Sequence, residues 1–155
     1  MNIQEFLSAK VAEIEINYKN KVKSSDRIKV AGSKDAFDVL QQIWSDKIEY
    51  VEEFYILLLN RANRVLGYTK ISEGGTSGTV ADAKRIFQSA LKANASSLIL
   101  SHNHPSGNAT PSDADRTLTR KLKEAGAFLD IAVLDHIILT PEGYFSFADE
   151  CIGLG

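Results

Sequence analysis

The sequence predicts an α/β fold in which a central sheet lies between helices, and three observations lead to this prediction. Short apolar runs typical of buried strands occur at residues 51–59 and 96–101. Apolar residues recur at helical spacing over residues 80–94 and again over 112–125. The chain has 155 residues, of which 44% are hydrophobic, so it fits one domain with enough apolar material for a core. Strands that alternate with helices favour a layered α/β sandwich.

Residues 1–47 are predicted to form a strand and helix extension that packs on the same domain. Residues 11–18 (VAEIEINY) alternate apolar and polar, which predicts a half-buried strand, and a second short strand is expected over 27–30. Ser33 is placed to N-cap a helix. The apolar positions of that helix recur at helical spacing: Ala36, Phe37, Leu40, Ile43 and Trp44.

Residues 48–155 are predicted to form the main part of the domain. The buried strand at 51–59 is followed by a hairpin turn at 60–63 and a returning strand at 64–71. The Gly-rich loop at 74–78 is not a phosphate loop, because no Gly-Lys-Ser/Thr follows it. The helix at 112–125 is expected to stop at Gly126, with further strands at 128–139 and 143–147.

Composition and charge exclude several classes of protein. The 18 basic and 20 acidic residues give a net charge of −2, which argues against direct DNA binding. A single cysteine, Cys151, excludes an intramolecular disulfide and is interpreted as a packing residue. No apolar stretch approaches the ~20 residues of a membrane span, and the N-terminus lacks the pattern of a signal peptide. We therefore expect a cytoplasmic protein with no membrane partner.

The residues that carry chemistry surround the end of the strand at 96–101. His102 and His104 are two residues apart, so in extended backbone their side chains project from the same face. Asp115 lies in the first turn of the following helix. Two neutral histidines and one carboxylate leave a fourth position open, which is the pattern of a catalytic zinc site, although iron and manganese also accept these ligands. The simpler alternatives are a capping box formed by Ser112 and Asp115 and a solvent-facing histidine pair.

This segment resembles the signature of the JAMM (MPN/JAB) metalloproteases. It reads His102-x-His104-Pro105, six residues, then Ser112-x-x-Asp115. Several segments of the sequence (HNHPSG, PSDAD, LDHIIL and YFSFADE) are similar to the RadC branch of that family, and the similarity covers roughly residues 52–153. The resemblance implies a three-layer, cytidine-deaminase-like α/β domain over residues 48–155 with a central mixed sheet. The residues before Glu52 read as strand, turn, strand and helix, so we expect a short form without the N-terminal helix-hairpin-helix segment of longer members.

The resemblance also implies roles for individual residues. His102, His104 and Asp115 match the ligands of one zinc ion (Zn2+), and Ser112 matches the serine that supports the oxyanion. The general base is expected to be Glu52 rather than Glu53, because Glu-x-Phe before the apolar run matches the RadC pattern.

Two further residues match features of the RadC branch. His136 is expected to lie beside the site or contact substrate, with a buried core histidine as the alternative. Arg85 is expected to bind a carboxylate or to cap a neighbouring element.

Three functions are compatible with these residues. The leading expectation is a zinc-dependent peptidase or isopeptidase acting on a peptide or protein substrate, in a DNA-repair-associated family. The second is a non-catalytic DNA-repair or mobile-element binding module with a vestigial metal site. The third is a zinc hydrolase acting on a non-peptide substrate, although the site lacks the cysteine ligands of zinc deaminases. A homo-oligomer is compatible with all three.

Overall fold

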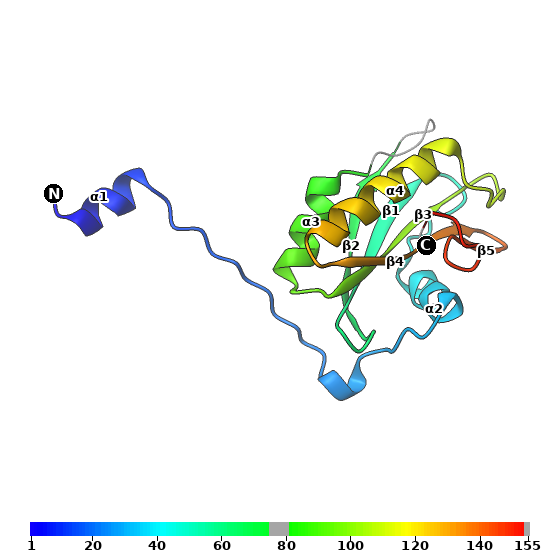
Figure 1. The fold of residues 1–155 in the computed structure, drawn as a ribbon, viewed down its shortest axis with the longest axis horizontal. Coiled ribbons are helices and arrows are strands. Elements are labelled where there is room, and N and C mark those ends of the chain that lie inside the picture. Colours follow the sequence, from blue (N-terminus) through cyan, green and yellow to red (C-terminus); the bar gives the residue numbers. More distant parts are fainter. Residues whose placement is uncertain (75–80, 154–155) are drawn as a thin grey trace.

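A computed structural model of the chain describes residues 1–74 and 81–153 and contains a five-stranded mixed sheet between helices (Figure 1). The strands are β1 (Glu53–Leu59), β2 (Val65–Glu73), β3 (Ser97–Asn103), β4 (Ala132–Thr140) and β5 (Gly143–Ser146). They lie in the order β2-β1-β3-β4-β5. The pair β3/β4 is parallel, and the other neighbouring pairs are antiparallel. The predicted α/β fold class is therefore confirmed.

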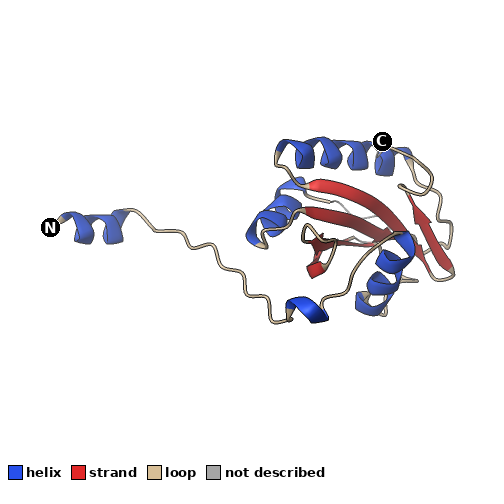
Figure 2. Ribbon diagram, turned by 60° about the horizontal axis from the view of Figure 1, so that its bottom comes forward, coloured by secondary structure: helices blue, strands red, loops and turns tan. Residues whose placement is uncertain are grey.

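Helices cover both faces of the sheet, which makes three layers (Figure 2). Helices α3 (Ala83–Lys92) and α4 (Asp113–Phe128) pack on one face, and α2 (Ser33–Ile43) packs on the other. Strand β1 is buried along its whole length, because its side chains alternate between the two cores. For example, Ile56 lies in the core under α3 and α4, whereas Leu57 lies in the core under α2. This explains why the strand reads as a continuous apolar run.

The parallel β3–α4–β4 unit positions the polar residues predicted to act together. The carboxyl end of β3 carries His102 and Asn103, and the chain then passes through a loop into the N-terminus of α4. The strand extends further than the sequence predicts, so that His102 lies within β3 and His104 directly after it. In open α/β sheets, ligand sites lie beyond the carboxyl ends of parallel strands.

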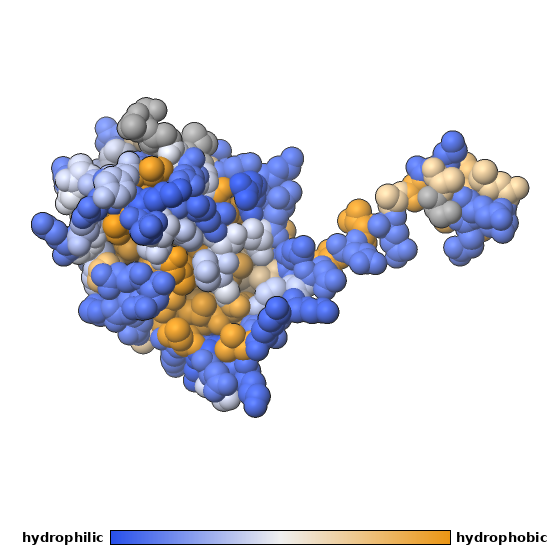
Figure 3. Space-filling model, turned by 180° about the vertical axis from the view of Figure 1, so that it is seen from behind, coloured by the Kyte–Doolittle hydropathy of each residue, from blue (hydrophilic) through white to orange (hydrophobic). Residues whose placement is uncertain are grey.

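The strand predicted over residues 11–18 does not form. After α1 (Ile3–Lys10), residues 12–20 run without strand or helix, and the segment extends away from the domain until it contacts β2 at Tyr18 (Figures 1 and 3). Ile14 and Ile16 are 84% and 80% exposed, and the Tyr18 hydroxyl donates to the Leu66 carbonyl. The alternation of apolar and polar residues over 11–18 indicates a local preference for extended backbone. A strand also needs a second strand beside it that completes its hydrogen bonds. Within the described chain these residues have no such ladder.

Other predicted element boundaries are shifted. The strand expected over 27–30 is reduced to one bridge between Lys29 and Arg64, just after the 3-10 turn at Ser24–Asp26. The N-cap of α2 is Gly32, so Ser33 is the first helical residue and not the cap. Residues 75–80, which include most of the Gly-rich loop, lie outside the described chain.

Gly126 does not end α4, as the sequence predicts, but lies within it. A Cβ atom at this position would lie 2.4 Å from the Ile131 carbonyl oxygen, so the helix approaches the β4 entry too closely for any side chain. The glycine is therefore explained by close packing and not by a helix stop. None of the helices in the described part of the chain is long and apolar enough to cross a membrane.

Candidate metal centre

Three predicted ligands converge on one point at the carboxyl end of β3. The Nε2 atoms of His102 and His104 are 2.9 Å apart. His102 Nε2 lies 3.3 Å from one carboxylate oxygen of Asp115, and His104 Nε2 lies 3.4 Å from the other. One ligand atom from each residue falls within 4.8 Å of the other two. The histidines come from β3 and the loop after it, and the aspartate comes from the first turn of α4.

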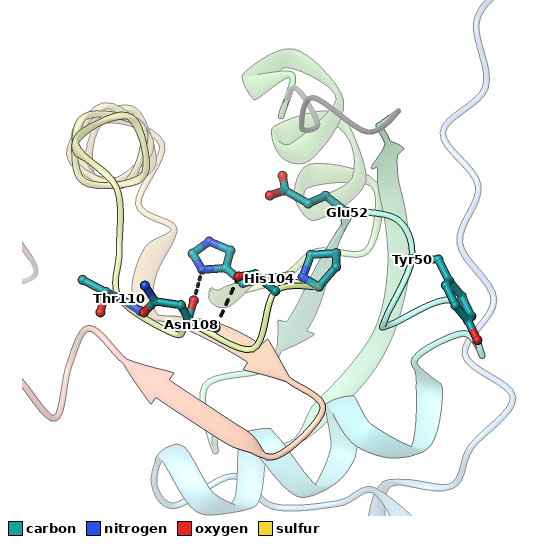
Figure 4. Close-up of a pocket in the computed structure, with 7 residues that line it drawn as sticks. Tyr50, Glu52, His104, Asn108 and Thr110 are labelled. Carbon is teal, nitrogen blue, oxygen red and sulfur yellow. Dashed lines mark hydrogen bonds between the residues drawn. The ribbon is translucent and has the colours of Figure 1, made fainter.

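The chemistry of this donor set fits a divalent cation. The Nδ1 atom of His104 lies 2.7 Å from the Asn108 carbonyl oxygen (Figure 4), which only accepts hydrogen bonds. Nδ1 therefore carries the proton, and in the neutral ring Nε2 presents a lone pair toward Asp115. A carboxylate and imidazole lone pairs at one point are favourable only with a shared cation, either a proton or a metal ion.

The electrostatics of the cluster agree with this interpretation. The hydrogen bond with Asp115 raises the pKa of His104, against the effect of partial burial. For Asp115, burial acts to raise the pKa, but the hydrogen bonds with His102 and His104 outweigh it and hold the pKa well below the usual range. A carboxylate that stays ionised is a suitable metal ligand at neutral pH.

Glu52, and not Glu53, lies on the side of β1 that faces the histidines. Phe54 pairs with His102 in the antiparallel register, so Glu52 and His104, each two residues further along, fall on the same face. Glu52 and His104 line one pocket of about 460 Å³ together with Tyr50, Asn108 and Thr110. Figure 4 shows the Glu52 side chain directed into the space on the same side as the His104 ring.

Glu53 points to the opposite face and has a different environment. It is fully buried, and its carboxylate accepts from the Ser45 hydroxyl and from the Lys70 ammonium at 3.0 Å. Strand alternation thus places Glu52 at the pocket and buries Glu53 on the other face, where it binds Ser45 and Lys70.

Asn103, which the sequence analysis did not single out, holds the backbone on both sides of Glu52. Its side-chain oxygen accepts from the Glu53 N–H at 2.7 Å, and its amide donates to the Val51 carbonyl at 2.9 Å and to the Ile48 carbonyl at 2.8 Å. Asn103 is fully buried. Its position between two histidines is visible in the sequence, but its partners lie about 50 residues away and become evident only in the fold.

Ser112 forms the capping box expected for α4. Its hydroxyl oxygen accepts from the Asp115 N–H at 3.0 Å, and the Asp115 carboxylate accepts from the Ser112 N–H at 2.8 Å. The cap orients the carboxylate toward the histidines. Because the hydroxyl oxygen acts as the acceptor there, its proton is still available for a donated hydrogen bond.

The structure places His136 at the site and gives Arg85 a structural contact. His136, in β4, is fully buried, and its Nε2 lies 2.7 Å from Nδ1 of His102. Its Nδ1 lies 2.6 Å from the Thr119 hydroxyl of α4, a residue that the sequence analysis did not identify. Burial lowers the pKa of His136 well below its usual value. Arg85 donates to the carbonyl of Ile71, within β2, at 2.7 Å.

Comparison with known proteins gives a consistent result over most of the chain. The family model of the RadC-like JAB domain matches residues 30–152. A UPF0758 protein of Flavobacterium johnsoniae is 41% identical over 143 residues, which cover 92% of this chain and 62% of that protein. A UPF0758 protein of Porphyromonas gingivalis is 38% identical over 125 residues, which cover 80% of this chain and 54% of that protein. The chain thus spans between about half and two thirds of the length of these relatives.

Proposed function

Because the chain belongs to the RadC-like JAB domain family, we propose that it is a zinc-dependent hydrolase of peptide or isopeptide bonds, in the DNA-repair-associated setting that the family resemblance implies. The observation that carries the proposal is the convergence of His102, His104 and Asp115 beside a pocket that also contains Glu52. The substrate class, a peptide or protein, is part of the same proposal.

His102, His104 and Asp115 would hold the zinc ion through two imidazole nitrogens and one carboxylate oxygen, which leaves a fourth position open. When bound there, zinc lowers the pKa of a water molecule and polarises a substrate carbonyl. Two of the three ligands are fixed by hydrogen bonds that orient the donor atom: His104 by the Asn108 carbonyl and Asp115 by the Ser112 N–H. Such supporting hydrogen bonds are typical of protein zinc sites.

Glu52 and Ser112 would supply the remaining chemistry. Glu52 would accept the proton of the attacking water and return it to the leaving amine. The side chain of Asn103 binds the backbone of the residues before and after Glu52, Val51 and Glu53, and so holds Glu52 at the edge of the pocket. The Ser112 hydroxyl would donate to the oxygen of the attacked carbonyl, a contact whose loss costs ~10²–10³ in rate in comparable sites.

The test compares Glu52→Gln with Glu49→Gln, which changes an exposed acid of the same segment. Both variants and the wild type are loaded with zinc and assayed against panels of peptides and isopeptide-linked conjugates. We expect Glu52→Gln to lose ~10²-fold or more in rate while it keeps its zinc, because the lost group transfers a proton, and Glu49→Gln to match the wild type.

Two outcomes would contradict the proposal. Equal rates in Glu52→Gln and the wild type would exclude Glu52 as the base. A zinc-loaded wild type that cleaves neither panel would favour the non-catalytic binding module instead.

A further inference from the structure

We propose that Thr119 and His136 are positioning residues that fix the tautomer of His102, so that its Nε2 atom presents a lone pair to the metal. The proposal rests on the zinc site proposed above, but it concerns two residues that touch neither the metal position nor the pocket. Three hydrogen bonds link Asp115, Thr119, His136 and His102 in sequence. Their directions follow from the chemistry of each group.

The direction of the first bond is fixed by a backbone carbonyl. The Thr119 hydroxyl lies 2.7 Å from the carbonyl oxygen of Asp115, one turn earlier in α4, and a carbonyl only accepts. The single hydroxyl proton is therefore committed to this bond. Consequently the hydroxyl oxygen acts as an acceptor toward Nδ1 of His136, 2.6 Å away, and Nδ1 of His136 carries a proton.

The second step follows from the surroundings of the His136 ring. Its ring is 0% exposed and lies against the aromatic rings of Phe54 and Phe147, with centroids 5.7 and 4.9 Å away. The ring is bonded to the imidazole of His102, and no carboxylate of the described chain forms an ion pair with it. The Asp135 carboxylate accepts from the backbone N–H of His136 at 2.7 Å. An imidazolium in this position would be buried without an opposite charge against the ring. With the proton on Nδ1, the Nε2 atom of neutral His136 is an acceptor.

The third step fixes His102. Its Nδ1 lies 2.7 Å from that acceptor and therefore carries the proton. The Nε2 atom on the other side of the ring is then unprotonated and directed at His104 and Asp115. The opposite arrangement would place a proton on Nε2, where a metal ion has to bind. His102 thus obtains from a buried histidine the support that His104 obtains from the Asn108 carbonyl.

The three hydrogen bonds also connect two of the proposed metal ligands. They begin at the backbone carbonyl of the ligand Asp115 and end at the ligand His102, so they tie α4, β4 and β3 together behind the site. The geometry of two ligands from different elements is therefore coupled through residues with no role in the reaction.

The experiment compares Thr119→Val with Thr119→Ser, a matched pair in which only serine keeps the hydroxyl. Two quantities are measured on the full chain at mildly alkaline pH. The first is the tautomer of His102 in the zinc-free protein, from two-bond ¹⁵N–¹H NMR correlations of the histidine rings. The second is the affinity for zinc alone, from competition with a chromophoric chelator.

We expect the wild type and Thr119→Ser to show the proton of His102 on Nδ1. In Thr119→Val, His136 loses the acceptor for its Nδ1 proton, and we expect part of the His102 population to carry its proton on Nε2. Zinc affinity should fall ~10–100-fold in Thr119→Val, the usual effect of losing a residue that supports a metal ligand, and much less in Thr119→Ser.

An unchanged tautomer and affinity in Thr119→Val, or equal losses in the valine and serine variants, would overturn the inference. If Thr119→Val does not fold, the pair His136→Gln and His136→Leu decides the question. Glutamine keeps an acceptor for His102 and leucine does not, so equal zinc affinity in these two would also overturn it. If the wild type binds no zinc, the proposed metal site fails, but the NMR comparison still tests the tautomer.

Discussion

Replacement of Asn103 by alanine should reduce both the stability of the fold and the precision with which Glu52 is held. The side chain makes three buried hydrogen bonds, to Glu53 N–H and to the carbonyls of Ile48 and Val51. At ~1 kcal/mol of net stability each, their loss costs about 3 kcal/mol. For a chain of this size that corresponds to a fall in Tm of roughly 6–12 °C. The variant frees the backbone on both sides of Glu52.

The assay for this prediction combines thermal unfolding, zinc content and hydrolysis. We expect Asn103→Ala to keep its zinc, because none of its hydrogen bonds holds a ligand side chain. Its hydrolysis rate should fall by ~10²-fold, the cost of misplacing a reacting group by about 1 Å. The control is Asn108→Ala, which removes one exposed bond to the Thr110 N–H and should change Tm by only a few degrees. An Asn103→Ala protein with the Tm and rate of the wild type would refute the reasoning.

Three further predictions concern the packing, the electrostatics and the N-terminal segment. Gly126→Ala should lower the Tm, because the overlap of its Cβ with the Ile131 carbonyl costs about 1–3 kcal/mol against a gain of up to ~1 kcal/mol in helix propensity; an equal or higher Tm would show that the close approach relaxes freely. In the zinc-free protein, the hydrogen bond with Asp115 raises the pKa of His104 above its ordinary 6.5, and the bonds with the histidines hold the pKa of Asp115 below its ordinary 3.8. The Tm difference between wild type and Asp115→Asn should thus be largest between pH 3.8 and 6.5, and should shrink as the pH rises through the pKa of His104 or falls through that of Asp115; a difference that grows above neutral pH would contradict this. Ile16→Asp should change the free energy of unfolding by no more than ~0.5 kcal/mol, because Ile16 is exposed. A large fall in Tm would indicate that the segment packs on the sheet in solution.

The features that could be predicted from the sequence are those encoded by neighbouring residues. The buried strand at 51–59 was evident because helices cover both faces of β1, so no polar side chain interrupts its apolar run after Glu53. The candidate ligands were evident because a strand places His102 and His104 on one face and a capping box orients Asp115. Strand alternation also explains why two adjacent glutamates have different environments.

The features that the sequence did not reveal depend on distant partners. The roles of Asn103 and Thr119 follow from contacts with segments 50 and 17 residues away, respectively, in the chain. The sequence predicts a helix stop at Gly126, but the glycine is needed for the close approach of the Ile131 carbonyl. This neighbour is a backbone group that any residue could provide, so the sequence does not reveal it. Residues 11–18 have the pattern of a strand, but the pattern carries no information on the edge that would have to pair with it.

The most direct test of the account is the zinc content of the purified chain, measured by elemental analysis in the wild type, Asp115→Ala and Asp113→Ala. Asp113 lies in the same helical turn but is exposed, so its variant controls for the loss of an acid near the helix N-terminus. The account predicts about one zinc ion per chain in the wild type and in Asp113→Ala, from one open three-ligand site, and loss of zinc in Asp115→Ala. A wild type that takes up no zinc at neutral pH, or an Asp115→Ala variant that binds it as tightly as the wild type, would contradict the proposed metal centre.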